Sequence, residues 1–522
     1  MFSVLVVSFI LCCIIWFVLL CNVSSFVNVS LLSLGGYWWL MSVDFDVVTL
    51  GVLLMLSICF LYVRHYTGHY FSGDECGYEL NKIIVLFVSV MGILVCTGDF
   101  LSTLILWEYL GVVSFFLILF YDNFLSLRSS IITLVSSRFG DVCLFLLIGL
   151  NCFMYSSFIP CLIYFFLIVF TKSASFPFIS WLLEAMRAPT PVSSLVHSST
   201  LVAAGVWFAM RYDYIQYFND SMWFSILLIL TILVTAISSL FFVDLKKIIA
   251  LSTCNNIAWC MLYLVYGDVL LSLFQLMSHG VSKCILFMLI GDIMSGSGGS
   301  QASNCVYSTT FYGNWNLFSS FLVILGLAGM PFIGVFFTKH FLLSTFTNII
   351  NVAVSLIICL CMFMSYLYSF RLCAILFNMN CSSNIGVLFF FNSGLMVFLW
   401  LFINFYLFFL LDETVFLSKL FSFILIISQL LSFVITLKIY DSNFASNWSS
   451  SLFGCDNLVE LCYQIFYSIL YILSIFFFRW DNLVISLFSS IGLRSSVQFY
   501  SWAILNIIMV STLALIFYLI IW

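Results

Sequence analysis

Residues 171–206 read TKSASFPFISWLLEAMRAPTPVSSLVHSSTLVAAGV, an apolar stretch that holds three of the chain's five prolines. Pro177, Pro189 and Pro191 fall within one window of 15 residues. Proline lacks a backbone N–H and breaks the hydrogen-bond ladder of a helix. In a membrane, a broken helix persists only where protein or water satisfies the freed backbone groups. We therefore expect an interrupted helix in this stretch, with its open backbone facing the protein interior.

A second interruption is expected about 150 residues further along the chain. Pro331 lies in the run GMPFIG at 329–334, in the middle of another apolar span. A lysine lies near each interruption, Lys172 near the first and Lys339 near the second. Paired interruptions of this kind are typical of transporters built from two related halves.

The composition of the whole chain is that of a membrane protein. Of its 522 residues, 64% are hydrophobic, 19% are aromatic and only 7% are charged. A soluble domain carries roughly 25% charged residues, so these charges are too few to build a water-facing surface. A soluble enzyme, a secreted disulfide scaffold and a nucleic-acid binder are therefore excluded. The net charge of -5 is too small to indicate a charged partner.

Apolar segments recur along the chain and predict about 14–16 membrane helices of roughly 20 residues each. Strands are not expected, because only helices or closed barrels satisfy their backbone in lipid. The predicted fold class is an all-α polytopic transmembrane bundle. The predicted spans are 2–20, 47–63, 83–98, 101–121, 130–150, 157–171, 192–210, 222–243, 248–266, 269–291, 317–337, 343–363, 386–411, 414–437 and 502–522.

Three segments interrupt this pattern. Residues 64–82 form the longest polar loop, and residues 295–316 are rich in Gly, Ser and Asn and predict a flexible loop. Residues 441–500 mix apolar stretches with charges, and predict either one more span or a helix that lies along the membrane. The run 2–20 lacks a basic segment and a cleavage site, so we interpret it as a membrane helix.

The cysteines and histidines do not predict a metal or redox site. The 19 cysteines are scattered through apolar runs without any C-x-x-C motif, which argues against iron–sulfur and zinc sites. His65 and His69 lie near Asp74, Glu75 and Cys76. They fall on a predicted polar loop with no helical motif around it, so no metal is expected there.

Titratable residues inside the predicted spans indicate the chemistry. A charged side chain in the mid-bilayer costs about 2.5–3.5 kcal/mol, so such residues usually face a polar interior and pair with one another. The pKa of a buried lysine shifts readily, and histidine titrates near neutrality. These groups suit a proton pathway, and no nucleophilic triad, haem-ligand pattern, P-loop or Rossmann fingerprint accompanies them. The candidates are Glu108, Lys172, His197, the i, i+4 pair His279 and Lys283, and Lys339.

Each candidate also has a purely structural interpretation. Glu108 could pair with an arginine for packing, and Lys172 could extend to the membrane surface from a helix end. His197 could be a hydrogen-bonded core histidine. The remaining charges with such an alternative are Arg138 with Asp141 as a helix-face ion pair, and Asp244, Lys246 and Lys247 as a surface cluster.

Several stretches resemble the antiporter-like membrane subunits of respiratory complex I, most closely the mitochondrially encoded chain 5 branch of that family. They occur in the family's order over roughly 265 residues. The 171–206 stretch is the most specific, and RFGD, FFTKH and YSFR favour chain 5 over its sister chains 4 and 2. The other matching stretches are WEYLGVVSFFLILFY at 107–121, SSRFGDVCLFLL at 136–147, DLKKIIALST at 244–253, SHGVSKCILFMLIGDI at 278–293, LAGMPFIGVFFTKHFLL at 327–343 and YSFR at 368–371.

The resemblance implies a role for each candidate. Glu108 and Lys172 are similar to the carboxylate–lysine pair of the first half-channel, in which Lys172 would accept the proton and Glu108 would set its pKa. Either Lys246 or Lys247 is similar to the lysine that links the two halves. Lys339 matches the broken-helix lysine through which the proton would leave. The other matched residues are His197 beside the first lysine, His279 and Lys283 on the central axis, and the supporting Arg138, Asp141, Asp244, His340 and Arg371.

Three positions depart from the family pattern. Ile179 replaces a histidine, Gln275 stands where a second axial histidine is common, and His340 replaces the aspartate after the exit lysine. Waters or hydroxyls, such as that of Ser180, would therefore have to bridge part of the path.

The resemblance also implies the organisation of the chain. Two inverted half-channel repeats are expected, followed by a long lateral helix near the carboxyl end and a final membrane anchor. The expected divisions are 1–100 for the amino-terminal helices and polar loop, 101–243 and 244–411 for the two half-channels, and 412–522 for the carboxyl-terminal helices.

The function implied is that of a core membrane subunit of complex I, which translocates protons across the inner mitochondrial membrane. NADH, flavin, iron–sulfur clusters and ubiquinone would be bound by other subunits, and this chain would hold no cofactor or metal. The expected partners are the other membrane subunits, especially chain 4, and membrane lipids, but no nucleic acid. The alternatives are a subunit of a multisubunit sodium/proton antiporter and a structural subunit that does not pump.

Overall fold

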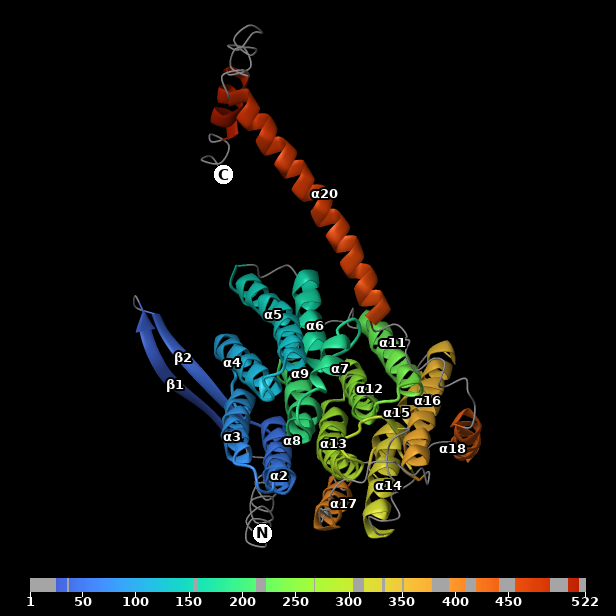
Figure 1. Ribbon diagram of the computed structural model, residues 1–522. Helices are drawn as coiled ribbons and strands as arrows, with labels where there is room; N and C mark the ends of the chain where they lie inside the picture. The colour runs from blue at the N-terminus through green and yellow to red at the C-terminus, as the bar shows by residue number, and fades with distance from the viewer. Residues whose placement is uncertain are drawn as a thin grey trace. The chain divides into compact units, whose positions relative to one another are not determined.

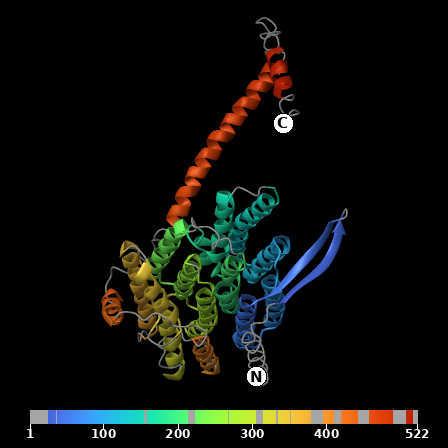
Figure 2. The same cartoon turned by 180° about the vertical axis from the view of Figure 1, so that it is seen from behind.

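The computed structural model divides the chain into two compact units, Met1–Cys455 and Asp456–Trp522. Within the first unit the helices stand side by side as a bundle, seen from both sides in Figures 1 and 2. The second unit contains α20 (Asp456–Phe488) and a shorter helix, Asn506–Leu515. The structure describes residues 25–34, 37–153, 158–212, 222–266, 268–303, 314–330, 334–349, 352–377, 394–408, 419–440, 456–488 and 506–515.

Helices dominate the described residues, as the apolar spans predict. Nine of the helices in these ranges are long and apolar enough to cross a membrane. The predicted polytopic helical fold is therefore confirmed. The helices of the first unit are α2 (Val47–Tyr70), α3 (Cys76–Val95), α4 (Phe100–Leu119), α5 (Phe124–Phe153), α6 (Phe158–Ser173), α7 (Ser180–Ala185), α8 (Thr190–Leu195), the π-helix η1 (Val196–Thr200), α9 (Leu201–Arg211), α11 (Met222–Ser239), α12 (Leu245–Val265), α13 (Val269–Gly296), α14 (Asn314–Ala328), α15 (Phe336–Ile349), α16 (Val352–Phe377), α17 (Gly394–Phe408) and α18 (Lys419–Tyr440).

Both predicted interruptions are present. After α6 the chain passes through the short helices α7 and α8 before it resumes a long helical path. The membrane-length window of Thr190–Arg211 is completely buried, so this part of the broken helix lies in the protein interior, as expected. The second interruption separates α14 from α15, between Ala328 and Phe336. Pro331 itself lies outside the described residues.

A two-stranded hairpin is the first difference from the sequence-based expectation. Strands β1 (Ser25–Leu34) and β2 (Tyr37–Phe45) pair antiparallel, Ser25 with Phe45 and Leu34 with Tyr37. The expectation that the chain contains no strands is therefore wrong. The rule behind it holds only for backbone exposed to lipid hydrocarbon. The signal for the hairpin was present in the sequence, because a Gly-Gly pair separates the two strands.

The predicted polar loop 64–82 is the second difference. Helix α2 continues to Tyr70 and α3 begins at Cys76, so only residues 71–75 separate them. Hydropathy identifies the apolar part of a helix but not its polar ends. Here Lys82 and Glu79, three residues apart, form a 2.7 Å ion pair on the first turns of α3.

The carboxyl-terminal predictions are met in part. Within 441–500, helix α20 occupies Asp456–Phe488. Of the predicted last span 502–522, the structure describes the helical residues Asn506–Leu515. The predicted first span, 2–20, lies outside the described residues.

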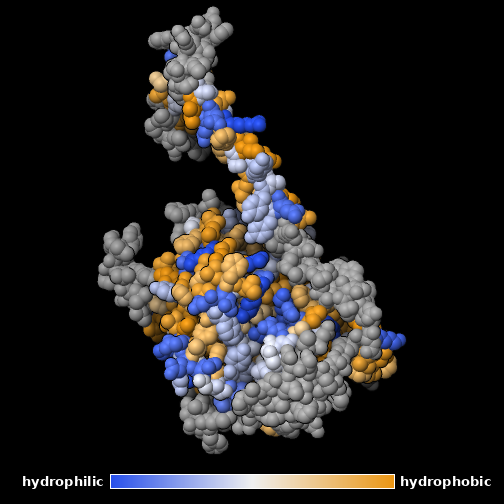
Figure 3. Space-filling model, viewed as in Figure 1, coloured by the Kyte–Doolittle hydropathy of each residue, from blue (hydrophilic) through white to orange (hydrophobic). Residues whose placement is uncertain are grey.

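The centre and the rim of the bundle differ in burial. The membrane-length windows of α12 and α13 are completely buried, whereas only 33% of the α5 window is buried. Figure 3 shows hydrophobic surface over much of the region of α4 and α5. Such a face suits lipid or another membrane subunit. Its exposed apolar side chains on α5, spaced three or four residues apart, are Ile131, Val135, Phe139, Val142 and Phe145.

Close packing of α9 on α6 can be tested at Gly205. A Cβ atom there would lie 3.0 Å from the Ser173 backbone nitrogen and 3.1 Å from the Val169 carbonyl oxygen. Backbone atoms cannot rotate aside, so we expect Gly205→Ala to separate the helices and to destabilise the protein by about 1–3 kcal/mol. The measurement is the melting temperature of the assembled protein.

Gly149→Ala in α5 is the matched control. Nothing lies within 4 Å of the Cβ position at Gly149, and alanine favours a helix over glycine by ~1 kcal/mol. A melting temperature of Gly205→Ala that equals or exceeds that of Gly149→Ala would contradict the close approach.

Candidate functional site

Lys172 lies in the last turn of α6 and points into the bundle, where it is only 1% exposed. Its ammonium stands 5.1 Å from the centroid of the Trp107 ring of α4, a cation–π distance. The backbone of α4 also comes close, since a Cβ at Gly111 would lie 4.0 Å from Lys172 Nζ, an ordinary van der Waals contact. Among the described residues the ammonium has no hydrogen-bond acceptor. Lys172 therefore does not extend to the surface, and packing and an aromatic face hold it in place.

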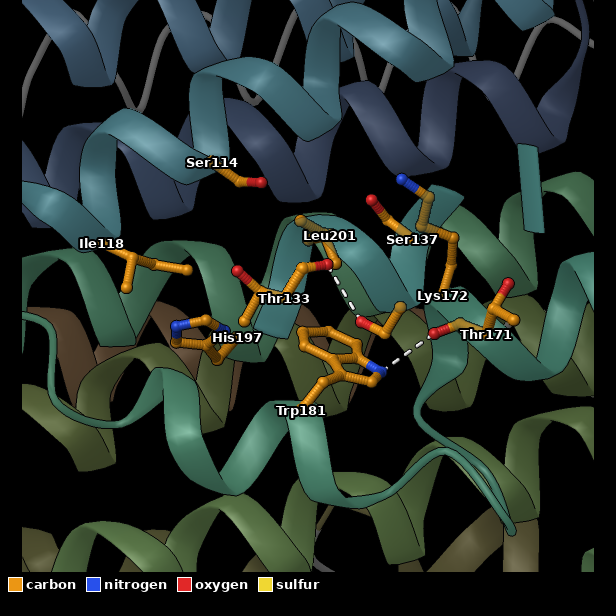
Figure 4. Close-up of a pocket in the computed structure, with 10 residues that line it drawn as sticks. Ser114, Ile118, Thr133, Ser137, Thr171, Lys172, Trp181, His197 and Leu201 are labelled. Atoms are coloured by element: carbon orange, nitrogen blue, oxygen red, sulfur yellow. Dashed lines mark hydrogen bonds between the residues drawn. The ribbon is translucent and has the colours of Figure 1, made fainter. Parts of the chain in front are cut away.

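A cavity beside Lys172 is lined by serine and threonine hydroxyls set among apolar side chains, and it is large enough for about one water molecule. Lys172 and His197 lie on opposite sides of it (Figure 4). The hydroxyls of Ser114, Thr133 and Ser137 each donate to a carbonyl three residues earlier in their own helix. Each oxygen keeps lone pairs for a donor in the cavity. The lining can therefore accept hydrogen bonds from an ammonium or a water without carrying charge itself.

The carboxylates near Lys172 are arranged around Arg138. Arg138 Nη1 lies 2.8 Å from Glu108 and 3.5 Å from Asp141. The Asp141 side chain is 5% exposed, whereas those of Glu108 and Arg138 are 36% and 38% exposed. Of the charged groups around Lys172, Asp141 interacts with it most strongly.

The ion pair that Glu108 forms is with Arg138. Contact of Glu108 with Lys172 through a water stays a prediction. The predicted Arg138–Asp141 pair is confirmed. The sequence could predict the Arg138–Asp141 pair, because the two residues are three apart on one helix. It could not predict the Arg138–Glu108 pair, because that depends on how α4 and α5 pack against each other.

His197 lies in η1, a π-helical turn within the buried segment. The hydroxyls of Ser199 and Thr200 donate to the Leu195 carbonyl at 3.2 Å and 2.9 Å. Turns of this kind are frequent at functional sites. The imidazole is fully buried, and neither ring nitrogen makes a hydrogen bond of ordinary geometry to the described residues. A role of His197 in the proton pathway stays a prediction.

Lys246 and Lys247 occupy different environments in the first turn of α12. Lys246 is buried and donates to the carbonyl of Ala188 at 3.1 Å, in the connection between α7 and α8. Lys247 is 35% exposed, and its ammonium lies 3.5 Å from Asp244. The surface-cluster interpretation therefore applies to Asp244 and Lys247. The geometry favours Lys246 as the lysine that faces the interior.

Helix α13 carries the central residues of the candidate path. Lys283 donates a short hydrogen bond to the Ser252 hydroxyl of α12. His279, one turn earlier, is fully buried and makes no hydrogen bond to the described residues. Gln275 accepts a 2.5 Å hydrogen bond from the Thr338 hydroxyl of α15. At this departure from the family pattern, a protein hydroxyl therefore connects α13 to the second broken helix.

Lys339 caps the open end of α14. Its ammonium donates to the Ala328 carbonyl at 2.8 Å and to the Ser365 hydroxyl at 2.9 Å. Its stem passes Gly329, where a Cβ would lie only 3.3 Å from Lys339 Cδ. Gly329 has φ +94°, a conformation that favours glycine. Lys339 therefore satisfies a backbone group that the helix interruption has freed.

Arg371 and His340 take structural positions. Arg371 donates to the carbonyls of Ser239 and Phe242 at 2.6 Å and 2.7 Å, and so caps the end of α11. The ring of His340 lies 5.3 Å from that of Phe336 in the preceding turn. Neither geometry by itself indicates a role in proton transfer.

Sequence reasoning missed several buried polar contacts. His69 lies on α2 rather than on a loop, and its Nε2 is 3.1 Å from Asp292 of α13. Arg211 forms ion pairs with Asp44 and Asp46. The signal for Asp292 was a carboxylate directly after the predicted apolar span 269–291. Within the described ranges, no three His, Cys, Asp or Glu residues gather as metal ligands would.

Comparison with protein families and curated proteins identifies relatives of this chain. The family model described as NADH:quinone oxidoreductase/Mrp antiporter, transmembrane, matches residues 97–367, just over half of the chain. NADH-ubiquinone oxidoreductase chain 5 of Caenorhabditis elegans is 35% identical over 315 residues, 58% of this chain and 59% of the relative. The Artemia franciscana chain 5 is 32% identical over 343 residues, 63% of each chain. The Anopheles arabiensis chain 5 is 33% identical over 350 residues, 62% of this chain and 89% of the relative.

These matches differ in how much of each relative they span. The chain spans about three fifths of the length of the nematode and brine-shrimp relatives, 59% and 63%. It spans 89% of the mosquito relative.

Solved structures show the same fold. The Mrp complex from Dietzia sp. DQ12-45-1b contains a chain with a TM-score of 0.72 at 18% identity, covering 94% of this chain and 60% of that chain. The membrane-bound sulfane sulfur reductase, an archaeal respiratory membrane complex, gives a TM-score of 0.64 at 14% identity, covering 77% and 87%. At these identities the likeness concerns the fold alone. The family model and the mosquito relative together show that this chain belongs to the NADH:quinone oxidoreductase/Mrp antiporter family of membrane proteins.

Proposed function

We propose that this chain is a core membrane subunit of respiratory complex I, of the chain 5 type, and that it moves protons across the inner mitochondrial membrane. NADH oxidation and ubiquinone reduction supply the energy elsewhere in the complex, where other subunits bind NADH, flavin, iron–sulfur clusters and ubiquinone. The chain takes part in this enzyme as a proton-translocating subunit. The observation that carries the proposal is a succession of buried titratable groups, Lys172, His197, Lys246, His279, Lys283 and Lys339.

The first part of the route joins Lys172 to Lys246. Lys172 and His197 face the same hydroxyl-lined cavity, so one water there can contact both groups. His197 and Lys246 are near enough for their charges to interact. A positive charge on one of these two groups disfavours a positive charge on the other, so their protonation states are coupled.

The second part of the route runs along α13. Helix η1 packs on α13 where Ser199 Cβ lies 3.5 Å from the Cβ position of Gly280, the residue after His279. Lys283 lies one turn further on, bound to Ser252. In the other direction, Gln275 and Thr338 connect α13 to the helix that carries Lys339. Proton transfer along this line needs only short movements of side chains and waters.

Arg138 gives the first half-channel a means of switching. An opposite charge nearby favours the charged form of a titratable group. While Arg138 is shared with Glu108, the negative charge of Asp141 remains available to stabilise a protonated Lys172. If a proton neutralises Glu108, Arg138 can move fully to Asp141. The hold on the protonated Lys172 then weakens, and the proton leaves toward His197.

The contacts of Lys246, Lys339 and Arg371 favour a second candidate function, that of a structural subunit that does not pump. All three cations bind open backbone carbonyls. A helix cap needs no change of protonation. This alternative does not explain why Lys172 is buried without a hydrogen-bond acceptor among the described residues, beside a cavity. The likeness to the Mrp complex concerns the fold and gives no argument for sodium transport.

The half-exposed Glu108–Arg138 pair indicates where a partner binds. Around it the outward side chains of α4 and α5 are apolar, including Tyr109 and Phe139, 59% and 48% exposed. Lipid would leave an ion pair in hydrocarbon at a considerable cost, whereas a polar group of another subunit would not. We propose that the α4/α5 face binds a neighbouring membrane subunit, in the first place chain 4. Lipid would cover the remaining apolar faces.

We expect Lys283→Met in the assembled complex to lower the number of protons pumped per electron. Methionine keeps an unbranched apolar stem, so the change removes the charge and the bond to Ser252. Proton uptake and NADH oxidation are measured together in sealed inner-membrane vesicles. Electron transfer in uncoupled vesicles should stay normal. A normal proton-to-electron ratio in a normally assembled complex would remove Lys283 from the route.

Lys246→Met and Lys247→Met form a matched pair of neighbouring lysines. We expect Lys246→Met to lower the proton-to-electron ratio and, by leaving the Ala188 carbonyl unpaired, to destabilise the protein by about 1–3 kcal/mol. Lys247→Met should keep the ratio, because Lys247 is partly exposed and pairs with Asp244. An effect of Lys247→Met without any effect of Lys246→Met would reverse the assignment.

The partner face can be mapped with cysteine cross-linking. We expect Phe139→Cys on α5 to cross-link to a neighbouring membrane subunit in the intact complex. Ile226→Cys on α11 is the matched control, 59% exposed on a different helix. Mass spectrometry of the cross-linked product identifies the partner. If both cysteines react only with reagents dissolved in the lipid and neither cross-links to a subunit, α5 faces lipid.

A further inference from the structure

A second titratable cluster lies outside the route from Lys172 to Lys339. His69 Nε2 lies 3.1 Å from Asp292 Oδ1, which joins α2 to α13. The Asp292 side chain is 6% exposed and that of His69 is 22% exposed. An imidazole and a carboxylate in contact can pass a proton between them. The pair therefore has one member that reaches the surface of the chain and one member inside.

The His69–Asp292 pair lies where two helices end in polar chain. Helix α2 ends at Tyr70, one residue after His69, and residues 72–76 that follow are exposed. Helix α13 ends at Gly296, one turn after Asp292, and a glycine- and serine-rich segment follows. Water can therefore approach His69 from this end of the bundle.

Tyr66, one turn before His69, leads from the pair into the interior. Its buried hydroxyl lies 3.5 Å from the hydroxyl of Thr190, the first residue of α8, and interacts electrostatically with Asp292. Gly291 permits this meeting, because a Cβ there would overlap the Tyr66 hydroxyl and lie 3.2 Å from Thr190 Oγ1. The absence of a side chain at Gly291 thus lets both hydroxyls pack against the helix backbone one residue before Asp292.

Thr190 leads on to Lys246. It is two residues after Ala188, whose carbonyl accepts the hydrogen bond of Lys246 at 3.1 Å. The segment after α13 folds back on the start of α12, where the backbone nitrogen of Leu245 donates to the Gln301 carbonyl at 3.0 Å. The end of α13 and the start of α12 therefore lie at the same end of the bundle, beside the Ala188–Thr190 segment that Lys246 binds.

We propose that His69 and Asp292 form a proton port that serves Lys246 through the hydroxyls of Tyr66 and Thr190. This port rests on proton translocation as the function of the chain, and adds a branch that meets the route at its middle lysine. His69 takes a proton from water and passes it to Asp292. Tyr66 accepts a proton from Asp292 as it releases its own toward Thr190. Thr190 accepts the proton from Tyr66 as it releases its own to a neutral Lys246. Both hydroxyls are therefore uncharged at the end of the transfer.

The test is Asp292→Asn in the assembled complex, measured as protons pumped per electron in sealed inner-membrane vesicles. We expect a loss of the protons that this chain contributes, with normal electron transfer in uncoupled vesicles. Asp268→Asn is the matched control at the opposite end of α13. Asp268 accepts a 3.0 Å hydrogen bond from the Leu271 backbone as the helix cap, and asparagine caps a helix equally well. A normal ratio in Asp292→Asn would overturn the port.

Tyr66→Phe is the second variant, and it decides the matter if Asp292→Asn does not assemble. It removes only the hydroxyl and keeps the ring. A lowered ratio supports the port, and a normal ratio overturns it. Lys283→Met separates this inference from the proposed function. Loss of pumping in Lys283→Met with normal ratios in both port variants rejects the port alone, whereas normal ratios in all three variants reject the proton route itself.

Discussion

Open backbone carbonyls inside an apolar bundle are the constraint on which this structure depends. A membrane interior offers no water to them, and each unsatisfied group costs several kcal/mol. The broken helices free carbonyls at Ala188 and Ala328, and the ammonium groups of Lys246 and Lys339 satisfy them. Lys246 and Lys339 and the helix interruptions that they cap thus require one another. A helix interruption without its lysine, or a lysine without its interruption, would leave an uncompensated polar group in the core.

Lys172 departs from this rule, and the departure distinguishes the first half of the bundle from the second. Among the described residues it has no hydrogen-bond acceptor, and it meets the Trp107 ring, the charge of Asp141 and a hydroxyl-lined cavity instead. A ring face attracts a cation without fixing the direction of any N–H. Lys339, in contrast, is held by Ala328 and by a serine hydroxyl. A change of charge therefore disturbs less structure at Lys172 than at Lys339.

The features with a high energetic cost could be predicted from the sequence. Prolines in apolar spans predicted both interruptions, and titratable residues in the same spans predicted Lys172 and Lys283 as buried. The facing of helices could not be predicted, because it depends on tertiary packing. Lys246 and Lys247 are neighbours on a helix that is apolar all round, so the sequence pattern cannot tell which one points inward. For the same reason the sequence could not show that Arg138 binds Glu108 across α4 and α5.

Lysine and arginine caps differ in whether they can change their protonation state. A neutral lysine amine still has N–H groups, so Lys246 and Lys339 can lose a proton and continue to donate to their carbonyls. Arginine stays protonated in proteins, and Arg371 holds two carbonyls of the α11 end in a fixed fork. Arg371 can therefore only cap, whereas a lysine can cap and relay a proton without opening the helix end that it closes. The caps in the interrupted helices are the places where this second property is useful, and those are the caps that lysine provides.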